Sequence, residues 1–65
     1  MPKTESKRIA LEMIDRNRNE MKRNDNDPKT REYYRGQAMA IAGYAYVVGI
    51  LEEKEFVEIT NKIWG

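Results

Sequence analysis

The sequence contains no cysteine and no histidine. Without cysteine the chain cannot form a disulfide, and without both residue types it lacks the usual ligands of a structural zinc ion. Small domains often depend on such cross-links or on association, because a short chain buries little of its surface on folding. At 65 residues the chain has room for one domain, residues 1–65. We therefore expect association to supply the stability that disulfides and zinc cannot.

The residues on which most catalysis depends are also missing. There is no histidine or cysteine for proton transfer or nucleophilic attack, and no glycine-rich phosphate loop after a strand. Glu52 and Glu55 form a carboxylate pair, but they stand at a predicted helix start, where the helix dipole accounts for acidic residues. A chain of this size has no room for a deep pocket. We predict a protein without enzymatic activity, cofactor or metal site.

No segment has the composition of a signal peptide or of a membrane span. The N-terminal sequence MPKTESKRIALEM is charged and has no apolar core region. The uncharged run from Ala38 to Leu51 has fourteen residues, whereas a membrane-spanning helix needs about 20. Together with the absence of cysteine, these features favour a cytoplasmic location and no membrane partner.

Turn and cap residues divide the chain into three predicted helices and no strand. The segment 24–28, Asn-Asp-Asn-Asp-Pro, marks the first break, with Asp27 as N-cap and Pro28 at the first helical position. Gly49 is suited to the left-handed conformation that ends the second helix. Because the first connection is short, we expect the first two helices to pair as an antiparallel hairpin. The expected fold is all-α, a long hairpin plus a short third helix, with helices at about 5–24, 28–48 and 52–64.

The run from Ala38 to Leu51 is apolar all the way round a helix, so it must be buried on every side. Three stripes of the second helix follow helical spacing. One can face the first helix and another the third, and the remainder needs a partner from outside the chain. We expect the stripe with the cleanest spacing to form a buried seam. The first stripe consists of Tyr34, Ala38, Ile41, Ala45 and Val48, the second of Tyr33, Ala40, Tyr44 and Val47, and the third of Met39, Ala42 and Tyr46.

Small residues line two sides of the same helix. A glycine inside a helix costs up to about 1 kcal/mol relative to alanine, so glycines here indicate close helix packing. That packing is either within one subunit or between copies. Because one short chain cannot cover three apolar stripes, we expect self-association into a homo-oligomeric helical bundle. One side carries Gly36, Ala40 and Gly43, and the other carries Ala38, Ala42, Ala45 and Gly49.

The first helix has a narrower seam. Its members recur at spacings of four, three and four residues, as in coiled coils. A buried asparagine in such a seam fixes register and oligomeric state, whereas a partly exposed one has no such role. The sequence leaves both interpretations open for Asn17. The seam consists of Ala10, Ile14, Asn17 and Met21.

We predict that the protein acts by binding itself and another protein. Aromatic residues are frequent anchors of protein interfaces, and Tyr44, Tyr46 and Trp64 are candidates for this role. The predicted oligomer or partner interface consists of Tyr34, Ala38, Ile41, Ala42, Gly43, Ala45, Tyr46, Val48 and Trp64.

Basic residues suggest an alternative. The first 35 residues hold ten Lys or Arg and seven Asp or Glu, and the last 30 hold two and four. A hairpin brings the end of the first helix beside Tyr33 and Tyr34. Arginine can bind phosphate bidentately and tyrosine can stack on bases, so the cluster is a candidate site for nucleic acid, or for a small anion between subunits. Interspersed acidic residues favour an ordinary solvated surface instead. The candidates are Arg18, Lys22, Arg23, Arg31 and Arg35.

The stretch from Arg31 to Ile63, REYYRGQAMAIAGYAYVVGILEEKEFVEITNKI, resembles short helical accessory proteins of tailed bacteriophages. In that group an Ala-rich helix with an aromatic-Arg-Gly start is followed by a glycine stop, an apolar pair and an acidic helix. The resemblance implies an oligomeric protein that binds a host or viral component in the host cytoplasm, and it transfers no functional residue. In length and architecture the hairpin is also similar to the small helical dimers that control plasmid copy number by gripping paired RNA loops.

Overall fold

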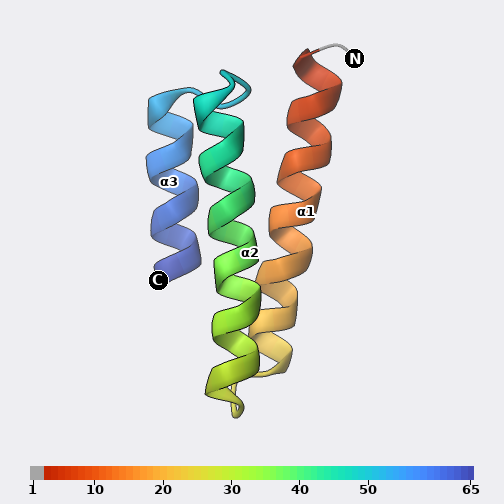
Figure 1. Ribbon diagram of the computed structural model, residues 1–65, viewed down its shortest axis with the longest axis vertical. Helices are drawn as coiled ribbons and strands as arrows, with labels where there is room; N and C mark the ends of the chain where they lie inside the picture. Colours follow the sequence, from red (N-terminus) through yellow and green to blue (C-terminus); the bar gives the residue numbers. More distant parts are fainter. Residues whose placement is uncertain (1–2) are drawn as a thin grey trace.

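The computed structural model describes residues 3–65 and contains three α-helices (Figure 1). Helix α1 spans Lys3–Arg23, α2 spans Pro28–Val47 and α3 spans Glu53–Trp64. No strand occurs within these described residues. The prediction of an all-helical chain with three helices is confirmed, and each observed helix end lies within two residues of its expected position.

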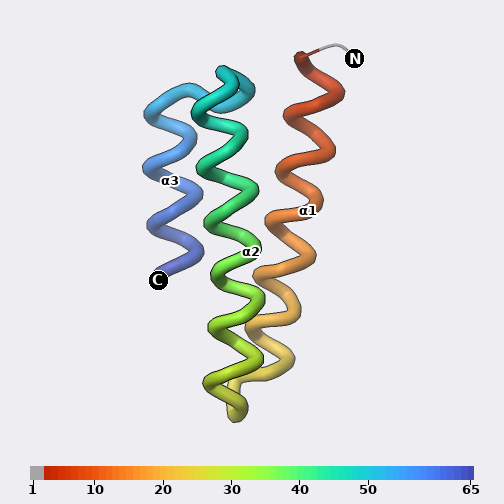
Figure 2. Tube along the Cα trace, in the orientation of Figure 1, coloured from red at the N-terminus to blue at the C-terminus, as the bar shows by residue number. Residues whose placement is uncertain are grey.

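The three helices form a small bundle. In the view of Figures 1 and 2, α2 lies between α1 and α3, and the chain reverses direction at each connection. The outer helices approach each other on one side of α2, where Leu11 of α1 and Ile59 of α3 line the same hollow. The Cα atoms extend over 38 × 20 × 13 Å. A bundle of this size buries little of its surface, so the side of α2 that faces away from both outer helices is left open.

Helix α2 begins with the cap that the sequence indicates. The Asp27 carboxylate accepts a hydrogen bond from the Thr30 backbone N–H (3.3 Å) and another from its hydroxyl group (2.7 Å). These two hydrogen bonds lower the pKa of Asp27. Pro28 occupies the first turn, where its missing N–H leaves no intrahelical bond unmade. Arg31 pairs with Asp25 across the connection (3.0 Å) and so ties α2 to the end of α1.

Helix α2 ends at a glycine, also as the sequence indicates. Gly49 has φ 84°, a left-handed conformation that is strained for other residues. Its N–H donates to the Tyr46 carbonyl (3.1 Å), and the Ile50 N–H donates to the Ala45 carbonyl (2.8 Å). This pair of bonds is the Schellman motif, which satisfies carbonyls that the helix leaves free. It turns the chain sharply enough for α3 to return along α2.

Helix α3 is tied both to its own start and to α1. The Glu55 carboxylate accepts a hydrogen bond from the backbone N–H of Glu52 (3.1 Å) and forms an ion pair with Lys7 of α1. The hydrogen bond from Lys7, followed by the one from Glu52, lowers the pKa of Glu55. Lys7 and Glu55 thus link the two outer helices near the start of α3.

The core is built around three alanines of α2. Ala38 and Ala42 are 0 % exposed and Ala45 is 1 % exposed. Because alanine is small, side chains from both outer helices reach over it: Ile14 of α1 and Ile63 of α3 belong to one buried cluster with Ala38 and Ala42. A second cluster contains Ala10, Ala45 and Leu51.

Among residues 3–65, Asn17 is the one polar residue that is buried in this core. Its side-chain amide donates to the backbone carbonyl of Met13, one turn earlier in α1 (2.9 Å). The polar group is therefore satisfied within its own helix.

Candidate binding surfaces

One face of α2 is covered by neither outer helix. We call it the open stripe. At about 100° per residue its members fall within an arc of about 100° on the helix. From Tyr33 to Val47 this arc contains no charged residue. It consists of Tyr33, Gly36, Ala40, Gly43, Tyr44 and Val47.

The large residues of the open stripe are strongly exposed, and there is empty space where its glycines would carry a Cβ atom. Tyr44 is 69 % exposed and Val47 is 81 % exposed. A Cβ atom added to Gly36 or Gly43 would meet no neighbouring atom within 4 Å. Each glycine weakens a helix by up to about 1 kcal/mol relative to alanine. Within the subunit no close packing compensates that cost.

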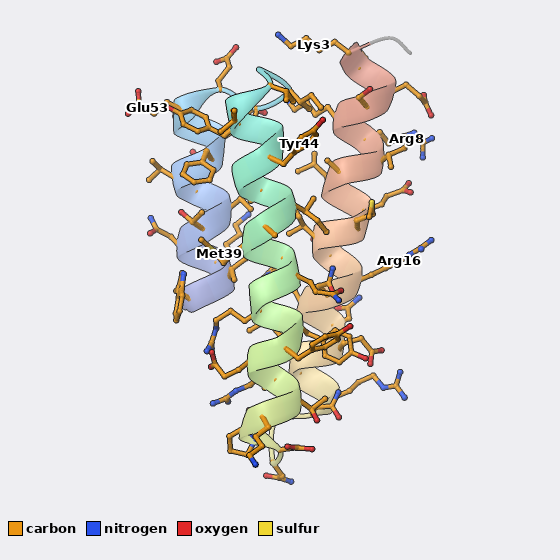
Figure 3. The ribbon with its side chains drawn as sticks, viewed as in Figure 1. Lys3, Arg8, Arg16, Met39, Tyr44 and Glu53 are labelled. Atoms are coloured by element: carbon orange, nitrogen blue, oxygen red, sulfur yellow. The ribbon has the colours of Figure 1, made fainter. Side chains whose placement is uncertain are left out.

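A groove between α1 and α2 continues the open stripe. It has a volume of about 440 Å³ and is lined almost entirely by apolar side chains, including Ile9 and Met13 of α1 and Ile50 after α2. Ala40 and Tyr44 belong to both the stripe and the groove. Figure 3 shows Tyr44 on the side of α2 that faces α1. Stripe and groove together form one continuous apolar surface.

Several residues assigned to an interface from the sequence lie elsewhere. The side chains of Ala38, Ala42 and Ala45 are covered by their own subunit, so they hold α1 and α3 against α2 and are not available to a second copy. Tyr34 and Ile41 are half-buried on the same inner side. The regular spacing of this stripe therefore marks the internal seam of one subunit, which corrects its assignment to an intersubunit interface.

The third stripe faces α3. Met39 lies between α2 and α3 (Figure 3) and packs on the cluster that contains Ile63. The ring of Tyr46 stacks on Phe56 with centroids 4.7 Å apart. Part of Tyr46 is thus held within the subunit, which reduces its value as a free anchor.

The remaining predicted interface residues are exposed. Gly43 lies on the open stripe, and Val48 is exposed at the end of α2. Trp64 is exposed at the end of α3, with the Arg35 guanidinium 4.7 Å from its ring centroid. Only Gly43 belongs to the uncovered face of α2.

The basic candidates meet in a hollow of about 290 Å³ where all three helices contribute. We call this hollow the basic pocket. Its apolar wall is made by Met21, Ile63 and Trp64, and Asp25 is its acidic lining residue. The basic lining residues are Arg18, Lys22, Arg31, Arg35 and Lys62.

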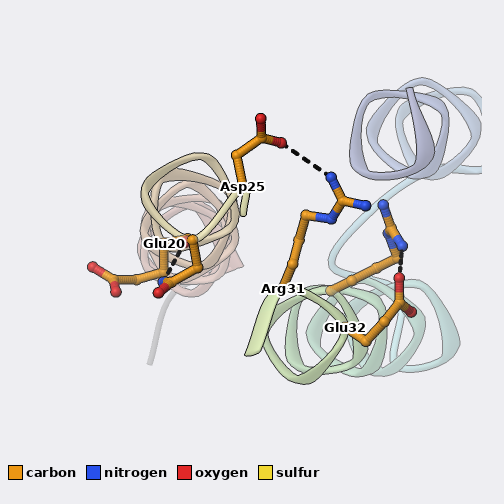
Figure 4. Close-up of polar contacts among 6 residues, drawn as sticks. Glu20, Asp25, Arg31 and Glu32 are labelled. Carbon is orange, nitrogen blue, oxygen red and sulfur yellow. Dashed lines mark hydrogen bonds and ion pairs between the residues drawn. The ribbon is translucent and has the colours of Figure 1, made fainter. Parts of the chain in front are cut away.

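Carboxylates hold the arginines of this pocket. Arg31 pairs with Asp25 (3.0 Å) and Arg35 pairs with Glu32, as Figure 4 shows for the labelled residues. The Nε atoms of Arg31 and Arg35 are buried and have no hydrogen-bond partner among residues 3–65. A buried donor without an acceptor costs about 1–3 kcal/mol. The two guanidinium groups are therefore held in place with part of their donor capacity unused.

The structure brings together four of the five predicted basic residues. Arg23 is the exception, because it is exposed and pairs with Glu20 on the outside of α1 (2.8 Å). Lys62 and Trp64 join the pocket from α3, and sequence reasoning did not place them there. Their position could have been inferred from the length of α3, because a helix of 12 residues that returns along α2 ends beside Arg35.

Three further searches gave no match. No helix among the described residues is long and apolar enough to span a bilayer. Within residues 3–65, no three Asp, Glu, His or Cys side chains are grouped closely enough to hold a metal ion. No known protein family, curated protein or solved structure matches this chain.

Proposed function

We propose that this protein is a non-enzymatic binding protein that self-associates through the open stripe of α2. The observation that carries the proposal is the uncharged, largely exposed stripe with two glycines at which an added Cβ atom would meet no neighbour within 4 Å. The phage accessory proteins that the segment 31–63 resembles are also commonly oligomeric. The oligomer would then present its outer faces to another protein.

A second copy is the occupant that fits the stripe best. Most homo-oligomers are dimers with a twofold axis, in which one surface packs against itself. If that axis passes beside Ala40 with the two α2 helices antiparallel, residues whose numbers sum to 80 lie opposite each other. Tyr44 then faces Gly36 of the partner subunit, and Tyr33 faces Val47 of the partner subunit. Each large side chain meets a smaller one, which allows the helices to approach closely.

Electrostatics and shape favour the same pairing. The part of α2 that follows Arg35 contains no charged residue. The centre of the interface therefore contains no like-charge contact and no charge that must lose its hydration. The adjoining apolar groove offers room for side chains at the edge of the partner's stripe.

Light scattering over a dilution series tests the proposal. The native chain is expected at a multiple of 7.7 kDa. Ala40→Lys places a charge at the centre of the open stripe, at an exposed position, and is expected to give a folded chain of 7.7 kDa with unchanged helical circular dichroism.

The matched control is Val57→Lys, which adds the same charge at an exposed position of α3. It is expected to keep the mass of the native oligomer. A native chain that stays at the mass of one subunit at every concentration would contradict the proposal. So would an Ala40→Lys variant that associates as strongly as the native chain.

A further inference from the structure

The basic pocket concentrates positive charge in a hollow rather than along a surface. Five basic side chains line it and Asp25 opposes them. Within residues 3–65, Lys22 and Lys62 form no ion pair. These two lysines come from α1 and α3, which approach each other on the same side of α2. The pocket therefore has a surplus of cations that an anion at its centre can reach from both sides.

The arginines of the pocket are positioned before any ligand arrives. Arg31 and Arg35 each place one terminal nitrogen on a carboxylate, so the guanidinium groups cannot swing freely into solvent. Bidentate recognition by arginine suits phosphate oxygens, so guanidinium groups held in this way are ready to receive a ligand with several oxygen atoms.

The opposite wall of the pocket is apolar and aromatic. Met21 and Ile63 are buried at its base, and Trp64 forms an exposed edge. The Arg35 guanidinium lies over the tryptophan ring, 4.7 Å from its centroid. A ligand that fits this site carries a compact negative group at one end and a flat apolar group at the other.

The surroundings favour a small molecule over a nucleic acid. Asp15, Glu20 and Glu32 lie among the basic residues near the pocket, and the net charge of the chain is +1. Nucleic-acid binding usually requires a continuous basic stripe. A volume of about 290 Å³ is close to the lower end of small-molecule sites.

We propose that the basic pocket binds a small phosphate monoester with a planar apolar group. The phosphate lies between Lys22 and Lys62 and within reach of the arginines, and the planar group lies against Trp64. A phosphate monoester carries nearly two negative charges at neutral pH, which matches this surplus of cations better than a single carboxylate does. The site uses no residue of the open stripe, so it does not depend on self-association.

Trp64 makes the test direct, because it is the only tryptophan of the chain and it lines the pocket. Its fluorescence is titrated with phenyl phosphate, with benzoate and with inorganic phosphate at constant ionic strength. Phenyl phosphate is expected to give a saturable change. Benzoate has the ring without the second charge, and inorganic phosphate has the charge without the ring, so both are expected to bind at least about tenfold more weakly.

The variant with both Lys22→Gln and Lys62→Gln locates the site. Both lysines are exposed and outside every ion pair within residues 3–65, so the fold is expected to persist, and circular dichroism checks this. The dissociation constant for phenyl phosphate is expected to rise at least about tenfold. Lys54→Gln is the matched control, because it removes the charge of an exposed lysine on α3 away from the pocket. It is expected to bind as the native chain does.

Three results would overturn the proposal. The first is a titration with phenyl phosphate that shows no saturable change. The second is equal binding by the native chain and the double variant, which places the ligand elsewhere. The third is a chain that binds a single-stranded oligonucleotide but does not bind phenyl phosphate. If the affinity for the oligonucleotide also falls steeply with salt, the pocket is a nucleic-acid site. None of them alters the mass measurement that tests self-association.

Discussion

Two faces of helix α2 carry similar small residues and meet different surroundings. On the covered face, Ala38 and Ala42 lie under the side chains of Ile14 and Ile63 and are fully buried. On the open stripe, Gly36 and Gly43 meet nothing within the subunit. Small residues allow a close approach on either face. What differs is whether the chain itself provides the neighbour, and only the covered face receives one.

The largest expected effect comes from a charge on the covered face. Ala42→Glu places a carboxylate where no partner and no water are available, and we expect a loss of more than about 3 kcal/mol in the free energy of unfolding. Ala40→Glu, two residues away on the open stripe, is expected to leave the isolated subunit folded. Thermal unfolding followed by circular dichroism compares the two. Equal melting temperatures for the two variants would show that both faces of α2 are equally buried.

A charge at the edge of the open stripe is expected to act on association instead. Val47→Lys adds a cation at the end of α2, where the helix dipole tolerates it, so folding is preserved. An unpaired charge inside an interface is costly, and we expect the association constant to fall by at least about tenfold. Sedimentation equilibrium measures this, with Val57→Lys as the control of the same chemistry. Similar losses in both variants would assign the effect to net charge rather than to the stripe.

Glycine substitutions sharpen the comparison further. At concentrations where the chain is a single subunit, Gly36→Ala and Gly43→Ala are each expected to stabilise it by about 0.5–1 kcal/mol, because alanine favours the helix and meets no neighbour. Association is expected to weaken, since two methyl groups then separate the helices. Urea unfolding and sedimentation measure the two effects. Gly49→Ala is the contrasting control: its φ of 84° predicts destabilisation.

The smallest expected effect is the response to acid of the link between α1 and α3. Lys7 lowers the pKa of Glu55, so the stabilisation by this pair is present above the ordinary value of 4.5 and is lost as the pH falls through the lowered value. The melting temperature is expected to decline slightly over that acid range. Glu55→Gln removes this part of the decline and leaves the part that comes from Asp27, whose pKa is also lowered. An unchanged acid profile in the variant would show that the pair does not stabilise the fold.

The ends of the helices were predictable because caps act locally. Asp27 bonds to the amide three residues later, and Gly49 adopts the conformation that side chains with a Cβ avoid. Both effects depend on a few neighbouring residues and not on the rest of the fold. Most of the basic pocket was predictable for a similar reason, since the short connection places Lys22 near Arg31. The contribution of Lys62 required the third helix to be placed.

The sequence by itself determined the helical class of this protein, the bounds of its helices and the excess of apolar surface on the second one, because periodicity and capping are properties of short segments. The tertiary structure decided which stripe of α2 is internal. The regular seam through Ala38 and Ala45 is filled by α1 and α3, and the stripe through Gly36 and Tyr44 is left open. All three stripes are apolar and helically spaced. Only the positions of the two outer helices distinguish a covered face from an exposed one.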